Sequence, residues 1–478
     1  MKCRPGWTGS LWVVLLPIAV TGLVLACKQV PHEQERMARH RAASYMVKDS
    51  SLLDQLEITG RGLEMLGPDT GNGARVPEAV IYWDEVGLFI RMVQALPLDT
   101  VLHYYETKGD NHWDAAHFGH LPSPVAAFTL PRNAEQPLAG MRIALDPGHV
   151  GGSMDYAQTM EEKYVRIRPD PDAGIPEEIG FCEGNLALGT ALLLAGRLRE
   201  EGAEVLLTRE REGLNAFGIT FDQWLQGEVA QHERWLRENG RTAVRSDPES
   251  WKVQCAAANY MRECRLPARD SVWWMTKATA VHVHRTIFLK AEFQERARII
   301  NAFRPHVTLL LHYNVREDNR AASDGYRLAI PENHCMAFIP GGYMNGELKE
   351  PQDRLAFAAR LLSDDLPQSE RLSGFIVRAH ERLLGVPAMA WDDRLQYLKN
   401  SSLLTREKGV FARNLQLTRL VQGTLCFGES LYQDNLQEAR LLNAKDFILP
   451  GMTTPLPHRI REVADAYYQG LHDWLDNQ

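Results

Sequence analysis

From Leu138 onward, the 478-residue chain alternates between short apolar runs and longer amphipathic segments. The apolar runs have the length of buried strands, whereas the amphipathic segments have the periodicity of helices. The predicted strands are Met141–Asp146, Glu204–Arg209, Val307–His312 and Gly423–Phe427, and the predicted helices are Asn185–Glu200 and Lys290–Phe303. Strands separated by helices are typical of a mostly parallel sheet with helices on both faces. We therefore expect an α/β domain over residues 138–478.

Residues 211–284 interrupt this alternation with a polar segment that is rich in tryptophan. Its tryptophans are Trp224, Trp235, Trp251, Trp273 and Trp274. The segment predicts a mostly helical insertion, in which tryptophans more often anchor a small core than stack on sugar rings. Long insertions in enzymes tend to be functional, so we expect this one to rim or cover the ligand cleft and to gate access to it.

Residues 27–137 precede the α/β domain and predict a tether followed by a small α+β region. The stretch 28–50 is polar with mixed charges, which suits a tether. Beyond it, Ala79–Trp83 and Thr100–Tyr105 are predicted strands with a helix between them. Nothing in this region indicates its role.

The first 26 residues have the layout of a secretory signal peptide. Lys2 and Arg4 form a short positive region, and the stretch from Leu11 to Leu25 is mostly apolar. The ending Leu25-Ala26-Cys27 resembles the lipobox of bacterial lipoproteins, in which the cysteine is lipidated and becomes the new N-terminus. We favour this interpretation over a plain signal peptide or a signal anchor, and expect a periplasmic protein anchored through Cys27. Lys28 points to the outer membrane.

The chain has seven cysteines. Removal of Cys3 with the signal and acylation of Cys27 leave Cys182, Cys255, Cys264, Cys335 and Cys426. An odd number in an oxidising compartment leaves at least one free thiol, and Cys255–Cys264 is the expected disulfide.

Composition narrows the class of protein. Hydrophobic residues make up 45% of the chain, which suffices for a large core. The formal net charge is −8 and no long stripe of Lys and Arg is present, so nucleic-acid binding is not indicated.

Two predicted strands end in a histidine. His149 follows the apolar run Arg142–Pro147 and a glycine, and His312 closes a second apolar run. Ligands of open α/β folds bind at the carboxyl edge of the sheet, so the two histidines can converge there on a metal ion. Glu183, just before a predicted helix, is a candidate third ligand, and Glu429, at the end of a late strand, is a candidate general base.

Structural roles compete with these assignments. Glu183 can instead be a helix N-terminal residue whose negative charge the helix dipole favours. Glu429 can instead be a strand-end residue whose carboxylate simply reaches solvent. His282 and His284 alternate as on a strand and form a second candidate metal pair without an acidic partner nearby. Asp392 and Asp393 form a carboxylate pair that we interpret as a solvated turn.

The order of these motifs resembles the zinc-dependent N-acetylmuramoyl-L-alanine amidases of the amidase-3 family. The run ending Leu145-Asp146-Pro147-Gly148-His149 is similar to the family's LDPGHGG motif. Leu310-Leu311-His312-Tyr313-Asn314 is similar to its SIHAN motif. The resemblance covers residues 139–478 without the insertion, and it implies that His149, Glu183 and His312 bind Zn²⁺ and that Glu429 is the general base and acid.

The resemblance implies hydrolysis of the amide between N-acetylmuramic acid and L-alanine in peptidoglycan. The sequence does not identify an activator protein. Alternatives are a zinc hydrolase of another amide or peptide, and a non-catalytic envelope-binding protein on the same fold. The chain departs from the family in Val150, Leu311, Tyr313 and Ser430-Leu431, and in a long, charged loop before Glu183. These departures affect the fit of the substrate more than the metal, since all four chemical groups are present.

Overall fold

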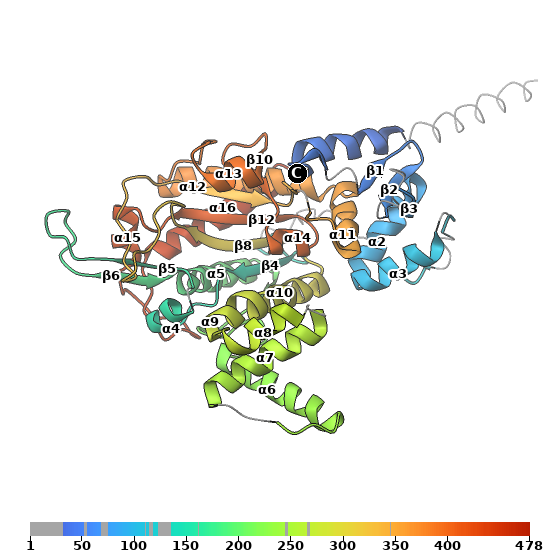
Figure 1. Cartoon of the computed structure of the whole chain (residues 1–478). Coiled ribbons are helices and arrows are strands. Elements are labelled where there is room, and N and C mark those ends of the chain that lie inside the picture. The colour runs from blue at the N-terminus through green and yellow to red at the C-terminus, as the bar shows by residue number, and fades with distance from the viewer. Residues whose placement is uncertain are drawn as a thin grey trace, which may run out of the picture. The chain divides into compact units, whose positions relative to one another are not determined.

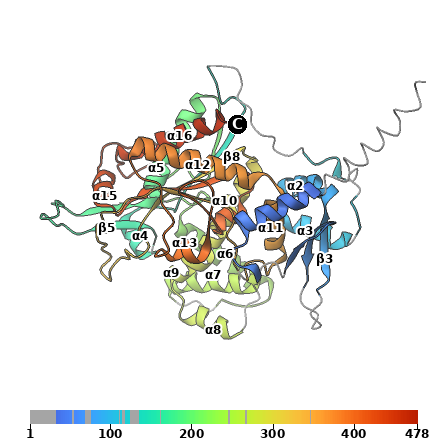
Figure 2. The same cartoon turned by 90° about the horizontal axis from the view of Figure 1, so that it is seen from above.

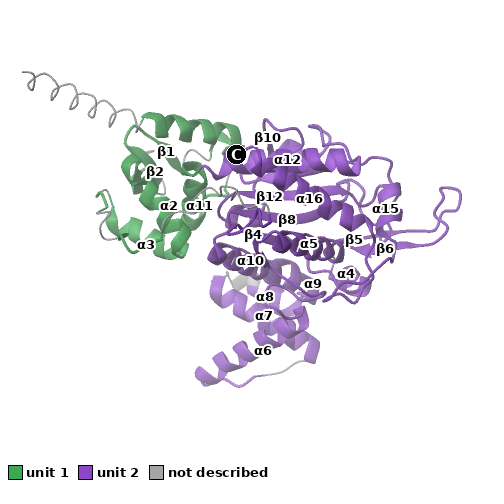
Figure 3. Cartoon of the chain, turned by 180° about the vertical axis from the view of Figure 1, so that it is seen from behind, with its two compact units in different colours: residues 1–122, 344–363 green, residues 123–343, 364–478 purple. Residues whose placement is uncertain are grey.

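The structure is a computed structural model. It describes residues 32–51, 55–67, 75–109, 111–113, 118–122, 135–160, 162–243, 247–264, 268–344 and 346–478. The predicted signal peptide and the predicted lipidation site, Cys27, lie outside these residues. The chain forms two compact units, which Figure 3 colours separately. The first unit contains Met1–Pro122 and Met344–Ser363, and the second contains Ser123–Tyr343 and Asp364–Gln478.

The first unit combines a small antiparallel sheet with helices. Its strands, in the order β1-β2-β3, are β1 (Leu56–Ile58), β2 (Gly62–Leu66) and β3 (Pro77–Tyr82). Its helical elements are residues 32–41, η1 (Ala42–Met46), η3 (Trp83–Glu85), α2 (Val86–Ala95), α3 (Leu98–Lys108) and α11 (Pro351–Leu362). The last helix comes from the 344–363 segment and packs on α2 and α3.

The predicted strand Thr100–Tyr105 is wrong, because these residues belong to α3. Val101, Tyr105 and Lys108 are buried while His103 is exposed, so burial follows a helical period. The β-branched and aromatic residues of this stretch suggested a strand, but tertiary packing overrides such propensities.

A seven-stranded sheet forms the centre of the second unit, with the order β10-β11-β9-β12-β8-β4-β7. Its strands are β4 (Arg142–Pro147), β7 (Glu204–Leu207), β8 (Val307–Asn314), β9 (Met336–Ile339), β10 (Ser402–Leu404), β11 (Val410–Arg413) and β12 (Leu425–Tyr432). The neighbours β7, β4, β8 and β12 are parallel, whereas β9 runs antiparallel to β12 and parallel to β11.

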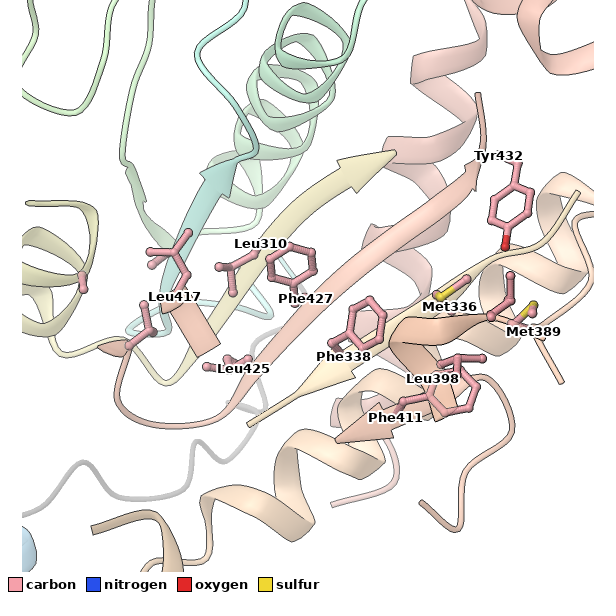
Figure 4. Close-up of a cluster of buried hydrophobic side chains, with 14 of the residues drawn as sticks. Leu310, Met336, Phe338, Met389, Leu398, Phe411, Leu417, Leu425, Phe427 and Tyr432 are labelled. Carbon is pink, nitrogen blue, oxygen red and sulfur yellow. The ribbon is translucent and has the colours of Figure 1, made fainter. Parts of the chain in front are cut away.

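Helices cover both faces of this sheet (Figures 1 and 2). Those on one face are α5 (Glu183–Glu200), α12 (Asp365–Leu384) and α16 (Arg459–Leu475). Those on the other are α10 (Leu289–Phe303), α13 (Gln396–Ser401) and α14 (Gln416–Leu420). The core on the second face centres on Phe338, Phe411 and Phe427, and Figure 4 shows Phe427 beside Leu310 and Phe411 beside Leu398. The predicted α/β fold with a mostly parallel sheet is confirmed.

The loop between His149 and Glu183 has its own structure. It contains α4 (Met154–Thr159) and an antiparallel hairpin of β5 (Tyr164–Ile167) and β6 (Ile179–Cys182). The remaining helix of this unit outside the insertion is α15 (Leu436–Leu442), whose Ala439 packs on the hairpin. The hairpin leads directly into α5, so it sets where Glu183 stands.

The insertion is helical, as predicted. It forms α6 (Phe221–Glu238), α7 (Pro248–Cys264), α8 (Ala268–Thr276) and α9 (Ala280–Val283), followed by the π-helical turn η5 (His284–Phe288). Figure 1 shows α6, α7 and α8 gathered below the sheet. Trp224 and Trp274 pack into its small core with Phe221 and Phe288, which agrees with an anchoring role for these two tryptophans.

The predicted Cys255–Cys264 disulfide is wrong, because both cysteines are free. They lie nine residues apart on α7, which puts their Cα atoms about 13 Å apart at the rise of an α-helix. A disulfide needs a Cα separation below about 7 Å.

No helix in the described part of the chain combines the length and hydropathy needed to cross a membrane.

Candidate metal centre and active site

The candidate site lies at the sheet edge where β4 and β8 end. His149 follows the end of β4 by two residues, whereas His312 and Glu429 lie inside β8 and β12, opposite each other in register. We expected both at strand ends, but β8 continues to Asn314 and β12 to Tyr432. Because these strands are parallel neighbours, the three side-chain positions share one edge.

His149 has a strained backbone. Its φ angle is 54°, in the left-handed region that costs a non-glycine residue on the order of 1–3 kcal/mol. Two buried arginines hold the carbonyls around it: Arg296 Nη2 donates to His149 O at 3.3 Å, and Arg209 Nη2 donates to Gly148 O at 2.9 Å. Arg209 also donates to Gly184 O at 2.7 Å, which fixes this turn to the start of α5.

Glu183 is the first residue of α5, and both of its carboxylate oxygens are held. The backbone N–H of Tyr313 donates to Oε1 at 3.1 Å, and Gln433 Nε2 donates to Oε2 at 2.9 Å. The side chain is buried, so these hydrogen bonds offset part of the cost of burying a charge. Glu183 therefore faces the histidines in a defined orientation.

His149, Glu183 and His312 converge. Each offers one ligand atom, and these atoms lie within 4.8 Å of one another. Oε1 of Glu183 lies 3.4 Å from Nε2 of His149 and 3.1 Å from Nδ1 of His312. The His312 ring stacks on Phe427 with centroids 4.2 Å apart, which fixes its plane. The structure thus brings together the three residues that the sequence marked as ligands.

This donor set fits a zinc ion. Two imidazoles and one carboxylate are a common ligand set of catalytic zinc, which keeps a fourth position open. Nε2 of His312 is buried and has no hydrogen-bond partner among the described residues, so the ring has an unused lone pair or N–H. Nδ1 of the same ring is the nitrogen that faces Glu183, at 3.1 Å from Oε1.

Glu162 is a residue that the sequence did not identify. Its Oε2 lies 3.2 Å from Nδ1 of His149, on the side of the ring away from Glu183. Its Oε1 lies 3.5 Å from Nε2 of His284, which also contacts the hydroxyl of Tyr156 at 3.1 Å. A carboxylate at this position orients a metal-binding histidine. In the sequence, Glu162 looked like one charge of a polar loop.

The charges of these residues are coupled. Burial disfavours the imidazolium of His149, but Glu183 and Glu162 outweigh burial and raise the pKa of His149 to about 9. Burial disfavours the carboxylate of Glu183, yet His149 and His312 hold its pKa well below the ordinary value. Burial also lowers the pKa of His312. Metal ligands are ionised carboxylates and neutral imidazoles, so a bound cation would displace the proton of His149.

Glu429 lines a cavity of about 690 Å³ beside the metal ligands. It is half-buried, and its Oε2 has no hydrogen-bond partner among the described residues. Burial and the negative charge of Glu183 raise its pKa to about 8. A carboxyl group with a pKa near neutrality exchanges protons readily at the working pH, as a general base and acid must. Glu162 lines the same cavity.

The second candidate metal pair is wrong. His282 and His284 lie on the helical segment formed by α9 and η5, not on a strand. Residues two apart on a helix face different directions, and His282 is exposed while His284 is buried. Asp392 pairs with the neighbouring Arg394, which agrees with a turn rather than a catalytic carboxylate pair.

Known proteins give a limited comparison. No family model and no curated protein matches the chain. Among solved structures, the chain is similar to the CwlD amidase of Clostridioides difficile in complex with the GerS lipoprotein, at 14% identity, covering 71% of this chain and 100% of that one with a TM-score of 0.33. It is also similar to the N-acetylmuramyl-L-alanine amidase Ami1 of Mycobacterium smegmatis, at 13% identity. That match covers 71% of this chain and 99% of the other, with a TM-score of 0.35. The match to the N-acetylmuramoyl-L-alanine amidase AmiC2 of Nostoc punctiforme has 12% identity. It covers 71% of this chain and 99% of the other, with a TM-score of 0.32. Identities and TM-scores this low leave the function to be argued from the site.

Proposed function

We propose that the chain is a zinc-dependent N-acetylmuramoyl-L-alanine amidase. The observation that carries the proposal is the convergence of His149, Glu183 and His312 at one sheet edge, with Glu429 opposite His312 on the next strand. The order of the sequence motifs resembles that of the amidase-3 family, and this resemblance supports the assignment of peptidoglycan as the substrate. The bond to be hydrolysed joins the lactyl carbonyl of N-acetylmuramic acid to the nitrogen of L-alanine in peptidoglycan.

His149, Glu183 and His312 would hold the Zn²⁺. Bound zinc in such sites polarises a carbonyl group and makes water more acidic. Glu162 orients the His149 ring through Nδ1, and Phe427 holds the plane of His312. These contacts keep one nitrogen of each ring, Nε2 of His149 and Nδ1 of His312, directed at Glu183.

Glu429 would move the proton. Its free Oε2 accepts a proton from the attacking water and then donates it to the leaving nitrogen as the C–N bond breaks. The products are a glycan strand with a free lactyl carboxylate and a stem peptide with a free L-alanine amine.

The remaining assignments follow from the sequence. Residues 1–26 would direct export, Cys27 would carry the lipid anchor, and residues 138–478 would form the catalytic region in the periplasm, attached to the outer membrane. The insertion 211–284 would gate the cavity; Arg285, directly after it, is a lining residue. Incorporation of labelled palmitate into wild-type protein but not into the Cys27→Ser variant tests the anchor.

The central experiment is digestion of purified peptidoglycan by the zinc-loaded Glu429→Ala variant, with mass spectrometry of the products. We expect a loss of about 10²–10⁴-fold in rate with the zinc content unchanged, since only the proton acceptor is removed. Full hydrolysis by this variant with zinc bound would overturn the mechanism. Glu177→Ala, which removes an exposed carboxylate away from the cavity, is the matched control.

Mass spectrometry also separates the alternatives. Release of peptides that begin with L-alanine identifies the amidase, whereas any other new terminus identifies a hydrolase of a different amide. Wild-type protein that holds no zinc, or His149→Ala protein that holds as much as wild type, would favour a non-catalytic binding protein.

A further inference from the structure

The cavity beside Glu429 is more cationic than the rest of the molecule. Its six basic lining residues are Lys163, Arg285, Arg316, Arg320, Arg327 and Arg413. Its three carboxylates are Glu162, Glu317 and Glu429, so the lining has an excess of three positive charges, while the whole chain has a net charge of −8. A concave surface with one excess sign of charge attracts ligands of the opposite sign.

Three of these arginines form no ion pair with a carboxylate in the described part of the chain. Arg316 is paired with Asp318 and Glu332, at 2.7 Å and 2.8 Å. Among the described residues, by contrast, no ion pair involves Arg320, Arg327 or Arg413. Arg327 donates only to backbone carbonyls, those of Tyr164 and Asn319. The unpaired arginines are therefore available to an anionic ligand.

Of the three arginines, Arg413 has the guanidinium whose position is most restrained by its neighbours. It ends β11 and is half-buried, and its guanidinium lies over the rings of Phe338 and Tyr397, 5.3 Å and 5.1 Å from their centroids. Stacking restrains the planar guanidinium, so it loses little freedom when it forms a paired hydrogen bond to a carboxylate. Glu429 lines the same cavity, and Arg413 acts on it through its charge but does not donate a hydrogen bond to its Oε2.

The two sides of the proposed scissile amide differ in charge. The acyl side is a lactyl sugar in a glycan strand, whose hydroxyl and acetamido groups are neutral. The amine side is a peptide with free carboxylates. A cationic cavity next to the proton-transferring Glu429 therefore matches the peptide side.

We propose that this cavity is a subsite for the carboxylates of the peptide released from the amide, with Arg413 as the main contact and Arg320 and Arg327 beside it. This inference rests on the proposed amidase function. It predicts that the protein distinguishes peptides with free carboxylates from peptides in which these groups are carboxamides, which have the same shape but no charge.

The test uses two synthetic disaccharide-peptides that differ only in this replacement. Zinc-loaded wild-type protein should cleave the carboxylate form with a kcat/KM about 10-fold or more higher, as expected for one charge-assisted bidentate contact. The Arg413→Gln variant should reduce the preference to about 3-fold or less, mainly through KM, and Arg413→Lys should recover part of it. Arg298→Gln, an exposed arginine on α10 outside the cavity, should behave as wild type.

Equal kcat/KM values for the two substrates in the wild type, or an unchanged preference in Arg413→Gln, would overturn the subsite. If the wild type cleaves neither substrate, the amidase proposal fails instead, and calorimetry then decides the subsite. Binding of the free tetrapeptide but not of its carboxamide supports the subsite, and equal affinities contradict it. Amidating one carboxylate at a time identifies which group Arg413 contacts.

Discussion

Nδ1 of His149 lies 3.2 Å from Oε2 of Glu162, a buried carboxylate from the loop between α4 and β5. The opposite nitrogen, Nε2, faces Glu183. This arrangement fixes which ring nitrogen is directed at the metal centre. It also connects the insertion to the site, because the other oxygen of Glu162 lies 3.5 Å from His284.

The Glu162→Gln variant should bind zinc about 10–100-fold more weakly, since the carboxylate that orients His149 is lost. Competition with a chromophoric chelator measures this affinity without any activity assay. Glu178→Gln, which removes an exposed carboxylate paired with Arg166, is the control and should bind zinc as the wild type does. An unchanged affinity in Glu162→Gln would mean that the contact does not orient the ligand.

The Gly148→Ala variant should lose zinc affinity for a steric reason. A Cβ atom at this position would lie 2.3 Å from Cε1 of His312, so the ring must leave the position in which it faces Glu183. Gly196→Ala on α5 is the control, because no atom lies within 4 Å of its added Cβ and alanine favours a helix by about 0.5–1 kcal/mol. Metal analysis of both variants after dialysis measures the difference. Equal zinc content would show that the His312 ring tolerates displacement.

Replacing Arg296 by methionine should destabilise the second unit by about 3–5 kcal/mol. Arg296 is buried between Asp146, at 3.3 Å, and Glu292, at 2.7 Å, so its removal leaves two buried carboxylates without their ion-pair partner. Arg298→Met removes an exposed arginine two residues further on and should cost within about 0.5 kcal/mol. Urea unfolding measures both. A cost below about 1 kcal/mol for Arg296→Met would contradict a structural role for this ion cluster.

His380 should make stability depend on pH. Burial lowers its pKa to about 4, while an unfolded histidine has a pKa of about 6.5. Between these values the unfolded chain binds a proton that the folded protein does not, so stability falls as the pH falls below about 6.5. The contribution of this one group is about 2 kcal/mol between pH 7 and pH 5.

The His380→Leu variant, which cannot titrate at this position, tests this contribution. Urea unfolding of metal-free protein at pH 7 and pH 5 should show a smaller loss of stability in the variant than in the wild type, by about 2 kcal/mol. All other titrating groups are common to both proteins and cancel in the comparison. Equal losses would show that His380 does not contribute.

Four strands of the sheet (β4, β7, β8 and β12) and the helices α5 and α10 were predictable because their periodicity is local. Runs such as Val307–His312 and Asn185–Glu200 carry their burial pattern within a few residues, and the structure confirms them to within two residues at each end. The stretch Thr100–Tyr105 was not predictable in this way, because packing rather than propensity made it a helix.

The sequence alone determined the α/β fold and marked His149, His312 and Glu429 near the carboxyl ends of predicted strands, which share one sheet edge when the strands are parallel, and it marked Glu183 at the start of a helix. Only the tertiary structure decided the partners of these residues. Glu162 and the arginine-lined cavity are set by how the α4–β5 loop, the insertion and β11 fold over that edge, and such contacts leave no local pattern in the chain. The disulfide expected between Cys255 and Cys264 failed for a local reason, since both cysteines lie on α7 and the rise of the helix holds them apart.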